Sequence, residues 1–382
     1  MNYKHRVNWV DGMKINKDHF IGFEDAMMQQ FASIQSSYVH HNNYGLIPGI
    51  ENQDKSVDLT VSIDGQESIH VVINRCMAVT LGGYQITIND KVNDYLSQSG
   101  QLIKNEFDFL KTEGAYYVVV SVNPYNRVSI GYADPNETPA RKPYVISGYQ
   151  ISLQPESQVQ NHEIGENSMV LAKVISDGSH VDLVDDFIPP CTSMQSHPDL
   201  NHAYNEIGSF FNSIEFYCTS VIQKIHQKKQ TNELAKMVRV LALDILTYLR
   251  GAIPTYRIND KYGSPVEMII KLMSLARTIK GSLDLHAGTG KENLLNYLTN
   301  WCDVNQGAFE NVLDEMIHLE YVHHDVNEAL QKVTSFTALM NALFKKLNEL
   351  EYIGKKSDSN IFVKEDVVTQ EPVKKRRRFF ME

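Results

Sequence analysis

The segment Gly288-Thr-Gly290-Lys291 has the residue types of a phosphate-binding loop, in which glycine amides and a lysine ammonium surround a phosphate. Three features contradict that interpretation. Leu285 occupies the place of the first required glycine, Glu292 follows the lysine where serine or threonine is needed, and no strand leads into the segment. We therefore predict a loop that precedes a helix near Leu294.

Glu315 and His318 have the Glu-x-x-His spacing of di-iron helical bundles. Such a site needs the pair twice, with further glutamates. The other match, Glu67 and His70, falls in a predicted strand, where side chains three residues apart point to opposite faces. Solvent-facing or capping roles are expected for these residues and for the neighbouring His323-His324-Asp325, so we predict neither a metal nor another cofactor.

Nucleophilic and redox chemistry also lacks support. The chain has no Gly-x-Ser-x-Gly elbow, and its carboxylate pairs, such as Asp185-Asp186, are adjacent as in ordinary acidic surfaces. The four cysteines are far apart and form no Cys-x-x-Cys pair, which indicates reduced and mostly buried thiols. These observations predict a protein that is not an enzyme.

The charge balance argues against nucleic acid as a partner. The net charge is -10, and residues 353–382 hold eight basic against five acidic residues, which leaves -13 for the rest. Binding to phosphates needs concentrated positive charge. The first ten residues lack the apolar core of a signal peptide, and no stretch approaches the roughly 20 apolar residues of a membrane span. A cytoplasmic location without membrane insertion is expected.

A length of 382 residues favours two domains. The period at which hydrophobic residues recur divides the chain into two regions accordingly. Residues 51–190 are rich in β-branched residues and are interrupted by turn residues such as Asp64-Gly65 and Gly82-Gly83. No helices are visible between the strands, so an antiparallel β-sandwich is predicted. The expected strands are 57–63, 68–73, 77–81, 84–88, 116–122, 144–153 and 169–175.

The period becomes helical in residues 191–352, after two prolines in Phe187-Ile-Pro-Pro-Cys191. Ser264, Pro265 and Glu267 have the residue types of a helix start, and further helices are predicted at 294–301, 309–316 and from Asp325 to Leu350. The resulting fold class is α+β, with a sandwich followed by a helical bundle.

A strict heptad stripe marks the first of these helices. Such a stripe is usually the core of a monomeric bundle, but its regularity also fits a trimeric neck. Both interpretations stay open. The candidate neck residues are Ile207, Phe211, Ile214, Val221 and Ile225.

Residues 353–382 lose the helical period and end in a basic and aromatic run. A charged terminal run is commonly solvated, although this one could also dock onto an acidic protein groove or an anionic membrane surface. The candidate docking residues are Lys374, Lys375, Arg376, Arg377, Arg378, Phe379 and Phe380.

Residues 1–50 form an entry segment with a distinctive motif. Val7-Asn-Trp9 is followed by Asp11-Gly12-Met13 and then by His19-Phe20, which leads into a helix towards Tyr38. This order resembles the entry motif of the TssK family of type VI secretion baseplate proteins. Tyr44-Gly45-Leu46 is similar to the step that closes the segment in that family, and Ile188-Pro-Pro-Cys191 is similar to its junction before the neck.

The resemblance implies a homotrimer with a β-sandwich shoulder like that of phage receptor-binding proteins, a helical neck and a head that faces the membrane complex. The shoulder end would attach to the TssF and TssG wedge, so the protein would link the baseplate to the envelope complex at the inner membrane. Only 32 residues follow Leu350, too few for a folded head. A compact form of the family is therefore expected, whose envelope partner does not follow from the resemblance.

The residues that the resemblance implicates in protein binding are Trp9, Gly12, Met13, His19 and Phe20. Trp9 and Phe20 could instead pack into the chain's own sandwich while Gly12 makes a turn, and both roles are compatible. Two alternative functions compete with a structural adaptor. The first is a phage-like tail protein that binds a receptor or carbohydrate, and the second is an enzyme in the helical half.

Overall fold

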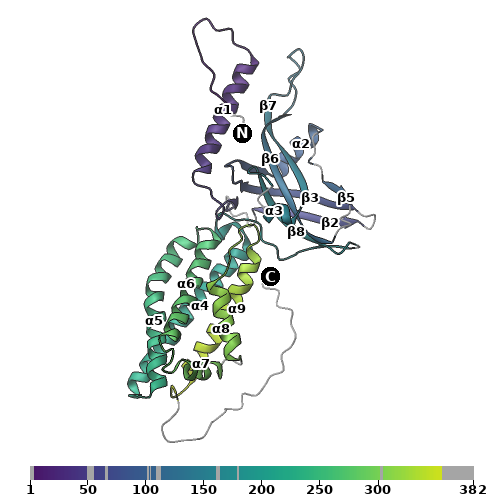
Figure 1. The fold of residues 1–382 in the computed structure, drawn as a ribbon. Helices are drawn as coiled ribbons and strands as arrows, with labels where there is room; N and C mark the ends of the chain where they lie inside the picture. Colours follow the sequence, from purple (N-terminus) through teal and green to yellow (C-terminus); the bar gives the residue numbers. More distant parts are fainter. Residues whose placement is uncertain are drawn as a thin grey trace. The chain divides into compact units, whose positions relative to one another are not determined.

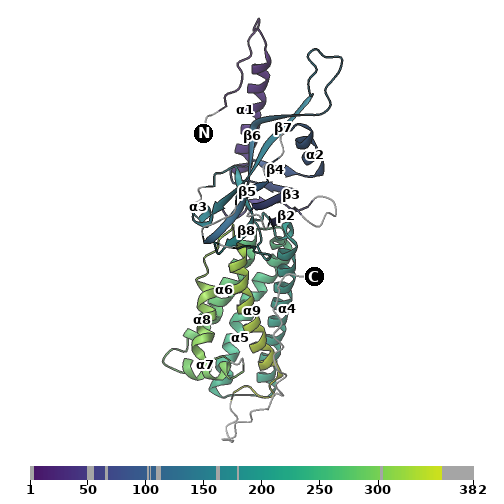
Figure 2. The same cartoon turned by 90° about the vertical axis from the view of Figure 1, so that its right-hand side faces the viewer.

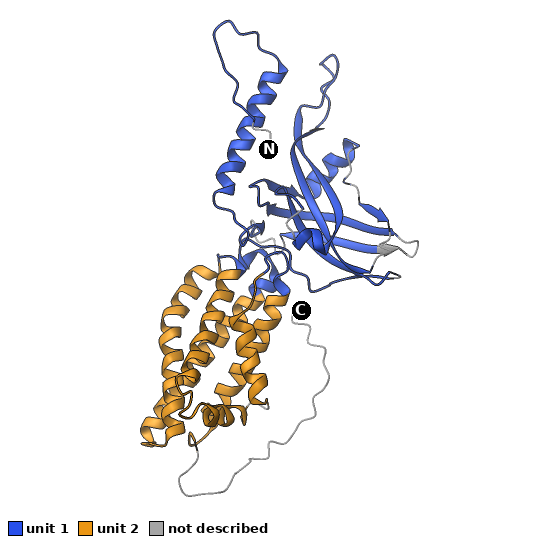
Figure 3. Cartoon of the chain, viewed as in Figure 1, with its two compact units in different colours: residues 1–201, 262–265, 322–327 blue, residues 202–261, 266–321, 328–382 orange. Residues whose placement is uncertain are grey.

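The computed structural model describes residues 4–49, 56–64, 68–100, 103, 105–108, 113–160, 164–178, 180–301 and 304–354. Within these ranges the chain forms two compact units (Figure 3). Unit 1 contains residues 1–201, 262–265 and 322–327, and unit 2 contains the remainder. The tail candidates from Lys374 to Phe380, as well as Glu67 and Cys302, lie outside the described residues.

Unit 1 is built on two antiparallel sheets, which confirms the predicted fold class of its N-terminal part (Figure 1). In the first sheet, the long central strand pairs with all the others. Its strands are β1 (Gly45–Leu46), β2 (Val57–Asp64), β3 (Ser68–Val79), β4 (Gln85–Ile88) and β5 (Glu106–Asp108). The second sheet has the order β7 (Tyr144–Pro155), β6 (Gly114–Ile130), β8 (Ser168–Ser176) and β9 (Val181–Leu183).

The strands are longer than the hydrophobic runs predicted. Strand β3 joins two predicted strands into one, and β6 continues past Val122 through a register shift between Asn123 and Arg127. Pairing with neighbouring strands supplies backbone hydrogen bonds to residues whose side chains carry no strand signal. A prediction from residue propensities alone therefore places the ends of these strands too early.

Two short helices within the sheet region were missed by the sequence prediction. They are α2 (Asp90–Gln98) and α3 (Glu156–Gln160), and a 3-10 helix, η1 (Met194–Ser196), follows the sheets. The Asn89 side chain caps α2 by accepting from the Val92 amide at 3.0 Å. Leu96 packs against Val128 and Ile130 of β6, so α2 covers one face of the second sheet.

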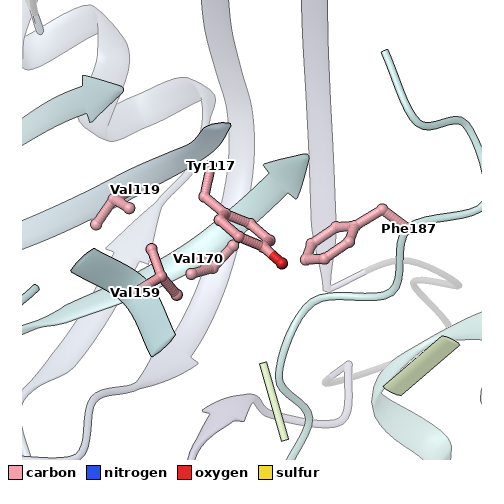
Figure 4. Close-up of a cluster of buried hydrophobic side chains, with 5 residues drawn as sticks. All are labelled: Tyr117, Val119, Val159, Val170 and Phe187. Atoms are coloured by element: carbon pink, nitrogen blue, oxygen red, sulfur yellow. The ribbon is translucent and has the colours of Figure 1, made fainter. Parts of the chain in front are cut away.

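A compact apolar cluster lies on the second sheet beside α3 (Figure 4). Its members come from β6, β8, α3 and the segment after β9, and all five are buried: Tyr117, Val119, Val159, Val170 and Phe187. The rings of Tyr117 and Phe187 meet edge to face, with centroids 5.8 Å apart. The cluster therefore fixes the Phe187-Ile-Pro-Pro-Cys191 junction to the sheet.

The Tyr117 hydroxyl reaches from this cluster into a network of charged groups. It lies 3.3 Å from carboxylate oxygens of both Glu156 and Asp325. The Lys173 ammonium donates to the same Asp325 oxygen at 2.9 Å and lies 3.2 Å from Glu156. Burial lowers the pKa of Lys173, but the hydrogen bond to Asp325 raises it above its ordinary value. The network ties residues 322–327 to the second sheet.

The Tyr44-Gly45-Leu46 segment lies against the Phe187-Ile-Pro-Pro-Cys191 junction. The Leu46 amide donates to the Pro190 carbonyl at 2.7 Å, and the Thr192 amide donates to the Leu46 carbonyl at 2.9 Å. Gly45 adopts a positive φ of 113°, and a Cβ there would lie 2.0 Å from the Pro190 carbonyl oxygen. Only glycine fits this step.

Unit 2 is a helical bundle, as the sequence predicted, whose helices run side by side (Figures 1 and 2). Helix α6 begins at Pro265 as expected, and α9 begins directly after Asp325. The helices are α4 (Pro198–Gln227), α5 (Glu233–Thr255), the π-helix η2 (Tyr256–Asp260), α6 (Pro265–Asp284), α7 (Lys291–Thr299), α8 (Gln306–Ile317) and α9 (Val326–Glu349). None of the described helices is long and apolar enough to cross a membrane.

The stripe considered for a trimeric neck faces the interior of this bundle. Each of its residues is at most 3% exposed: Ile207, Phe211, Ile214, Val221 and Ile225. Phe211 packs edge to face on Tyr256, whose hydroxyl donates to the Tyr204 carbonyl. The stripe is accounted for by the bundle's own core, so a neck seam on α4 would have to use other residues.

The residues considered for chemistry have structural partners. Lys291 forms ion pairs with Asp284 at 2.7 Å and Glu310 at 3.0 Å, and the preceding glycines lie in turns, as predicted. Among the described cysteines, Cys76, Cys191 and Cys218 are buried thiols. No group of three or more histidine, cysteine or carboxylate side chains in the described part of the chain could hold a metal.

The expectation of solvent-facing histidines was wrong for His323 and His324, which are both buried. His323 Nε2 lies 2.8 Å from the Tyr44 carbonyl oxygen and must carry the proton, since that oxygen can only accept. Burial lowers the pKa of His323 to about 4, the hydrogen bond to Tyr44 opposes that shift, and the nearby charges of His324 and His40 add to it.

Acid should weaken the fold through His323. Between pH of about 6.5 and 4 the unfolded chain binds a proton that the folded chain excludes, so stability falls as the pH falls. The loss should reach about 3 kcal/mol. Urea unfolding of His323→Gln, which can still donate to Tyr44, should show a shallower pH dependence than the wild type. The same change at exposed His318 should leave the slope intact, and equal slopes for all three proteins would contradict this role of His323.

Candidate protein-docking surface

Helix α1 (Lys17–Ser36) carries the end of the entry motif, and a capping box starts it. The Asn16 side chain accepts from the amides of Asp18 at 3.0 Å and His19 at 3.2 Å. In return, His19 Nδ1 accepts from the Asn16 amide at 3.2 Å. These bonds satisfy amides that have no partner inside the helix. His19 therefore has a structural role in addition to any role in binding.

The chain before α1 folds back along the helix. Gly12 adopts a positive φ of 78°, and the Met13 amide donates to the Val10 carbonyl at 3.2 Å, which closes the turn. At the far end of the segment, Lys4 is bound twice by α1. Its backbone amide donates to Gln29 at 2.6 Å, and its ammonium lies 3.2 Å from Asp25. The entry segment is thus fixed at both ends.

This turn brings three residues of the entry motif together. The Trp9 ring lies 6.2 Å from both His19 and Phe20, measured between ring centroids. Trp9 is 47% exposed and Phe20 is 56% exposed. The alternative that both aromatic rings bury into the sandwich was therefore wrong, although Gly12 does make the turn. Met13 is half-buried, and Gly12 itself is exposed.

One face of α1 rests on the sheets through short and polar side chains. Its buried residues are Asp25, Ala26, Gln29 and Ala32. The Gly82-Gly83 turn after β3 approaches the helix so closely that a Cβ on Gly83 would lie 2.2 Å from the Ala32 carbonyl oxygen. An ion pair of 2.7 Å between Arg127 of β6 and Glu24 adds a second contact. In both views α1 runs beside the long strands β6 and β7 (Figures 1 and 2).

The opposite face of α1 is apolar and open to solvent. We call this face, together with Tyr38 in the turn directly after the helix, the outward stripe, and five of its six residues are between 42% and 77% exposed. Large exposed apolar patches on soluble proteins commonly mark interaction sites. With Trp9 alongside, the stripe extends the entry motif along the whole helix. Its residues are Phe20, Phe23, Met27, Phe31, Ile34 and Tyr38.

Sequence reasoning identified the start of this surface but missed most of the stripe. The signal was present, because Phe20, Met27 and Ile34 are spaced seven apart. An apolar helical stripe ordinarily faces the core. Only the buried alanines on the other face, together with Gly83, reveal that this one faces outward.

Replacing Gly83 should detach α1. Gly83→Ala introduces both a strained positive φ of 79° and a clash with the helix backbone. Gly100→Ala is the matched control, since Gly100 has a φ of 71° but open space around its Cβ position. We expect the control to cost about 1 kcal/mol in urea unfolding and Gly83→Ala to cost more. Limited proteolysis should cut within α1 only in Gly83→Ala, and equal effects of the two changes would argue against this anchor.

No protein-family model and no curated protein matches the sequence. Among solved structures the chain is similar to a crystal structure of TssK, with 12% identity and a TM-score of 0.49 over 90% of this chain and 69% of that chain. It is similar to a chain of the type VI secretion TssK-TssF-TssG baseplate subcomplex seen by cryo-electron microscopy, with 12% identity and a TM-score of 0.41 over 91% and 99% of the two chains. It is also similar to a chain of a type VI secretion baseplate complex, with 13% identity and a TM-score of 0.46 over 89% of this chain and 99% of that chain. These structures are thus TssK or type VI baseplate complexes, the group that the entry motif resembles.

Proposed function

We propose that this chain is a non-catalytic structural adaptor of a type VI secretion baseplate. In this proposal it assembles as a homotrimer on the cytoplasmic side of the inner membrane. It joins the TssF/TssG-like wedge of the baseplate to the cytoplasmic part of the envelope complex. The observation that carries the proposal is the aromatic surface formed by Trp9 and Phe20, which the fold holds exposed.

The composition of this surface favours a protein partner. Aromatic side chains and methionine are enriched at protein interfaces and dominate their energetics. Trp9 and Phe20 stand beside each other at the start of α1, half exposed, where each could insert into a pocket of a partner. The entry motif that resembles TssK is the segment that builds this arrangement.

The rigidity of the surface supports the same role. Lys4, Asn16 and the Gly12 turn fix the entry segment to α1, and Gly83 and Arg127 fix α1 to the sheets. A surface that is ordered before binding loses less conformational entropy when the partner arrives. This is a useful property for a subunit that transmits a defined geometry between two assemblies.

The order of the two units along the chain is a further argument. A unit of antiparallel sheets that precedes a helical bundle is the arrangement expected of a shoulder followed by a neck. The basic run from Lys374 to Phe380 is proposed as a second docking element, for a partner that its sequence does not identify.

A receptor-binding or carbohydrate-binding tail protein is the second candidate. Tyr132 and Tyr144 favour it, since they are 87% and 68% exposed at the two ends of the loop that joins β6 and β7. Exposed aromatic faces can stack on the apolar faces of sugar rings. These tyrosines are distant in sequence from the entry motif, so variants can separate the two functions.

Capture by purified TssF/TssG-like wedge proteins tests the adaptor role. The double variant Trp9→Ala, Phe20→Ala should lose at least about tenfold in affinity, because each truncated anchor commonly costs more than 1 kcal/mol. Tyr132→Ala, which removes an even more exposed aromatic residue outside the entry motif, should bind like the wild type.

The outcome that would overturn the proposal is a wild-type chain that ignores wedge proteins but binds a glycan array. Loss of glycan binding in Tyr132→Ala, with retention in the Trp9 and Phe20 variant, would then favour the tail-protein alternative. Equal wedge capture by the wild type and the Trp9 and Phe20 variant would show that the wedge proteins bind other residues of this chain. The adaptor role would then stand, but Trp9 and Phe20 would not be its binding surface.

A further inference from the structure

The second sheet ends in a strand that lacks the usual protection of a sheet edge. Strand β7 pairs with β6 on one side, and none of the described strands pairs with its other side. Soluble proteins commonly protect such edges with charged residues, bulges, prolines or short strands, because unpaired N–H and C=O groups can pair with another chain. Strand β7 is 12 residues long, carries no charge and has no proline before its final Pro155. Its register with β6 is interrupted only by extra residues on β6.

Other strands at the edges of the two sheets do have such features. Strand β2 carries Asp58 and Asp64, and its register with β3 shifts directly after Asp58. Strand β9 is only three residues long and has Asp182 at its centre. Strand β4 is covered at Thr87, whose amide donates to the Tyr149 hydroxyl at 3.3 Å and whose carbonyl accepts from it at 3.0 Å. The open edge of β7 is therefore not a general property of this fold.

One hydrogen bond reveals which backbone groups of β7 point outward. The Val122 amide of β6 donates to the Asn167 carbonyl, just before β8, at 3.0 Å, so the Val122 backbone faces away from β7. In an antiparallel pair, opposite residues point their N–H and C=O groups either towards each other or away from each other, in alternation. Tyr149, which lies opposite Val122, therefore directs its N–H and C=O away from β6. The same applies to Ile151 and Leu153, two and four residues further on.

The side chains of β7 define what kind of segment fits beside it. On one face of the strand, Ile151 is buried and Leu153 is half-buried. On the other face, Gln150, Ser152 and Gln154 are polar and uncharged. Neighbouring strands stabilise each other when side chains of matching chemistry lie side by side, and no charge is present here to pair with a charged occupant. The edge therefore fits an extended segment in which apolar and uncharged polar residues alternate.

Strand β7 shares its support with the entry-motif surface. Arg127 of β6 lies opposite Ser147 of β7, and its guanidinium forms the 2.7 Å ion pair with Glu24 of α1. The same pair of strands thus supports both the open edge and the helix that begins beside Trp9 and Phe20. A protein that binds those two aromatic side chains finds the edge of β7 on the same rigid unit.

We propose that an extended segment of the wedge partner adds to the second sheet beside β7, with main-chain hydrogen bonds to Tyr149, Ile151 and Leu153. The inference rests on the proposed function, since it names the chemistry by which the proposed wedge partner is held. Main-chain hydrogen bonds supply affinity in this mode of recognition, and the alternation of side chains supplies selectivity. Trp9 and Phe20 keep their role as aromatic anchors.

Hydrogen exchange at single-residue resolution tests the added strand directly. The full chain is compared with and without purified TssF/TssG-like wedge proteins, with single residues resolved by electron-transfer fragmentation in mass spectrometry. The amides of Tyr149, Ile151 and Leu153 should exchange fast in the free chain and at least about tenfold more slowly in the complex. The amides of Gln150 and Ser152, which point towards β6, should be slow in both states and serve as internal controls.

A lysine on the edge should weaken the complex without unfolding the chain. Gln150→Lys places a charge beside the proposed strand, at an exposed position of β7. Ser62→Lys is the matched control, because it places the same charge at an exposed position of the edge strand β2. Capture of wedge proteins should fall about two- to fivefold for Gln150→Lys and stay at the wild-type level for Ser62→Lys. Both variants should keep the wild-type circular dichroism and urea unfolding midpoint.

Three outcomes would overturn the inference. Wedge capture without slower exchange at Tyr149, Ile151 and Leu153 would refute the added strand and keep the adaptor role. Slow exchange of these amides in the free chain would show that the edge is already covered without the wedge proteins. A wild-type chain that does not capture wedge proteins would refute both the proposed function and the wedge segment as the occupant of this edge.

Discussion

Helix α1 packs on its sheets through its backbone and its short side chains, and the exposed surface of unit 1 depends on this contact. Gly83 admits the helix backbone to a distance that any side chain would prevent, and Ala26 and Ala32 complete the contact. The larger apolar residues of α1 then have no place inside the domain. Keeping them in water is unfavourable, so a surface of this kind is expected to be covered in the functional assembly.

The second constraint in unit 1 is the charged network around Tyr117. A partly buried ion pair such as Lys173 with Asp325 offsets its desolvation only when its remaining groups are also satisfied. Here the Tyr117 hydroxyl and Glu156 supply those partners. Removing one member would leave charge without compensation, so the network specifies where residues 322–327 lie more than it adds to stability. The neutral His323 beside Tyr44 reinforces the same placement.

The buried contacts and the exposed surface of unit 1 have different roles in the fold. The network, the apolar cluster and the Gly45 step fix connecting segments that are distant in sequence, and they are closed to solvent. The entry segment and α1 are held with equal definition but present their aromatic side chains outward. The proposed adaptor role would need both properties, because a surface transmits geometry only when the structure that supports it is rigid.

Much of this protein followed from its sequence. The change from period two to period 3.6, the helix start at Pro265 and the entry motif depend on local residue types, and local chemistry acts in the same way in any fold. The short helices α2 and α3 and the full length of β6 did not follow, because tertiary pairing overrides weak propensity. The direction of the apolar stripes was decided only by tertiary structure. Ile207 and Phe211 on α4 face a core, whereas Phe31 and Ile34 on α1, with the same kind of spacing, face solvent. Spacing determines that a helix has an apolar face, but what lies against that face depends on contacts between residues far apart in the chain, such as Gly83 with Ala32.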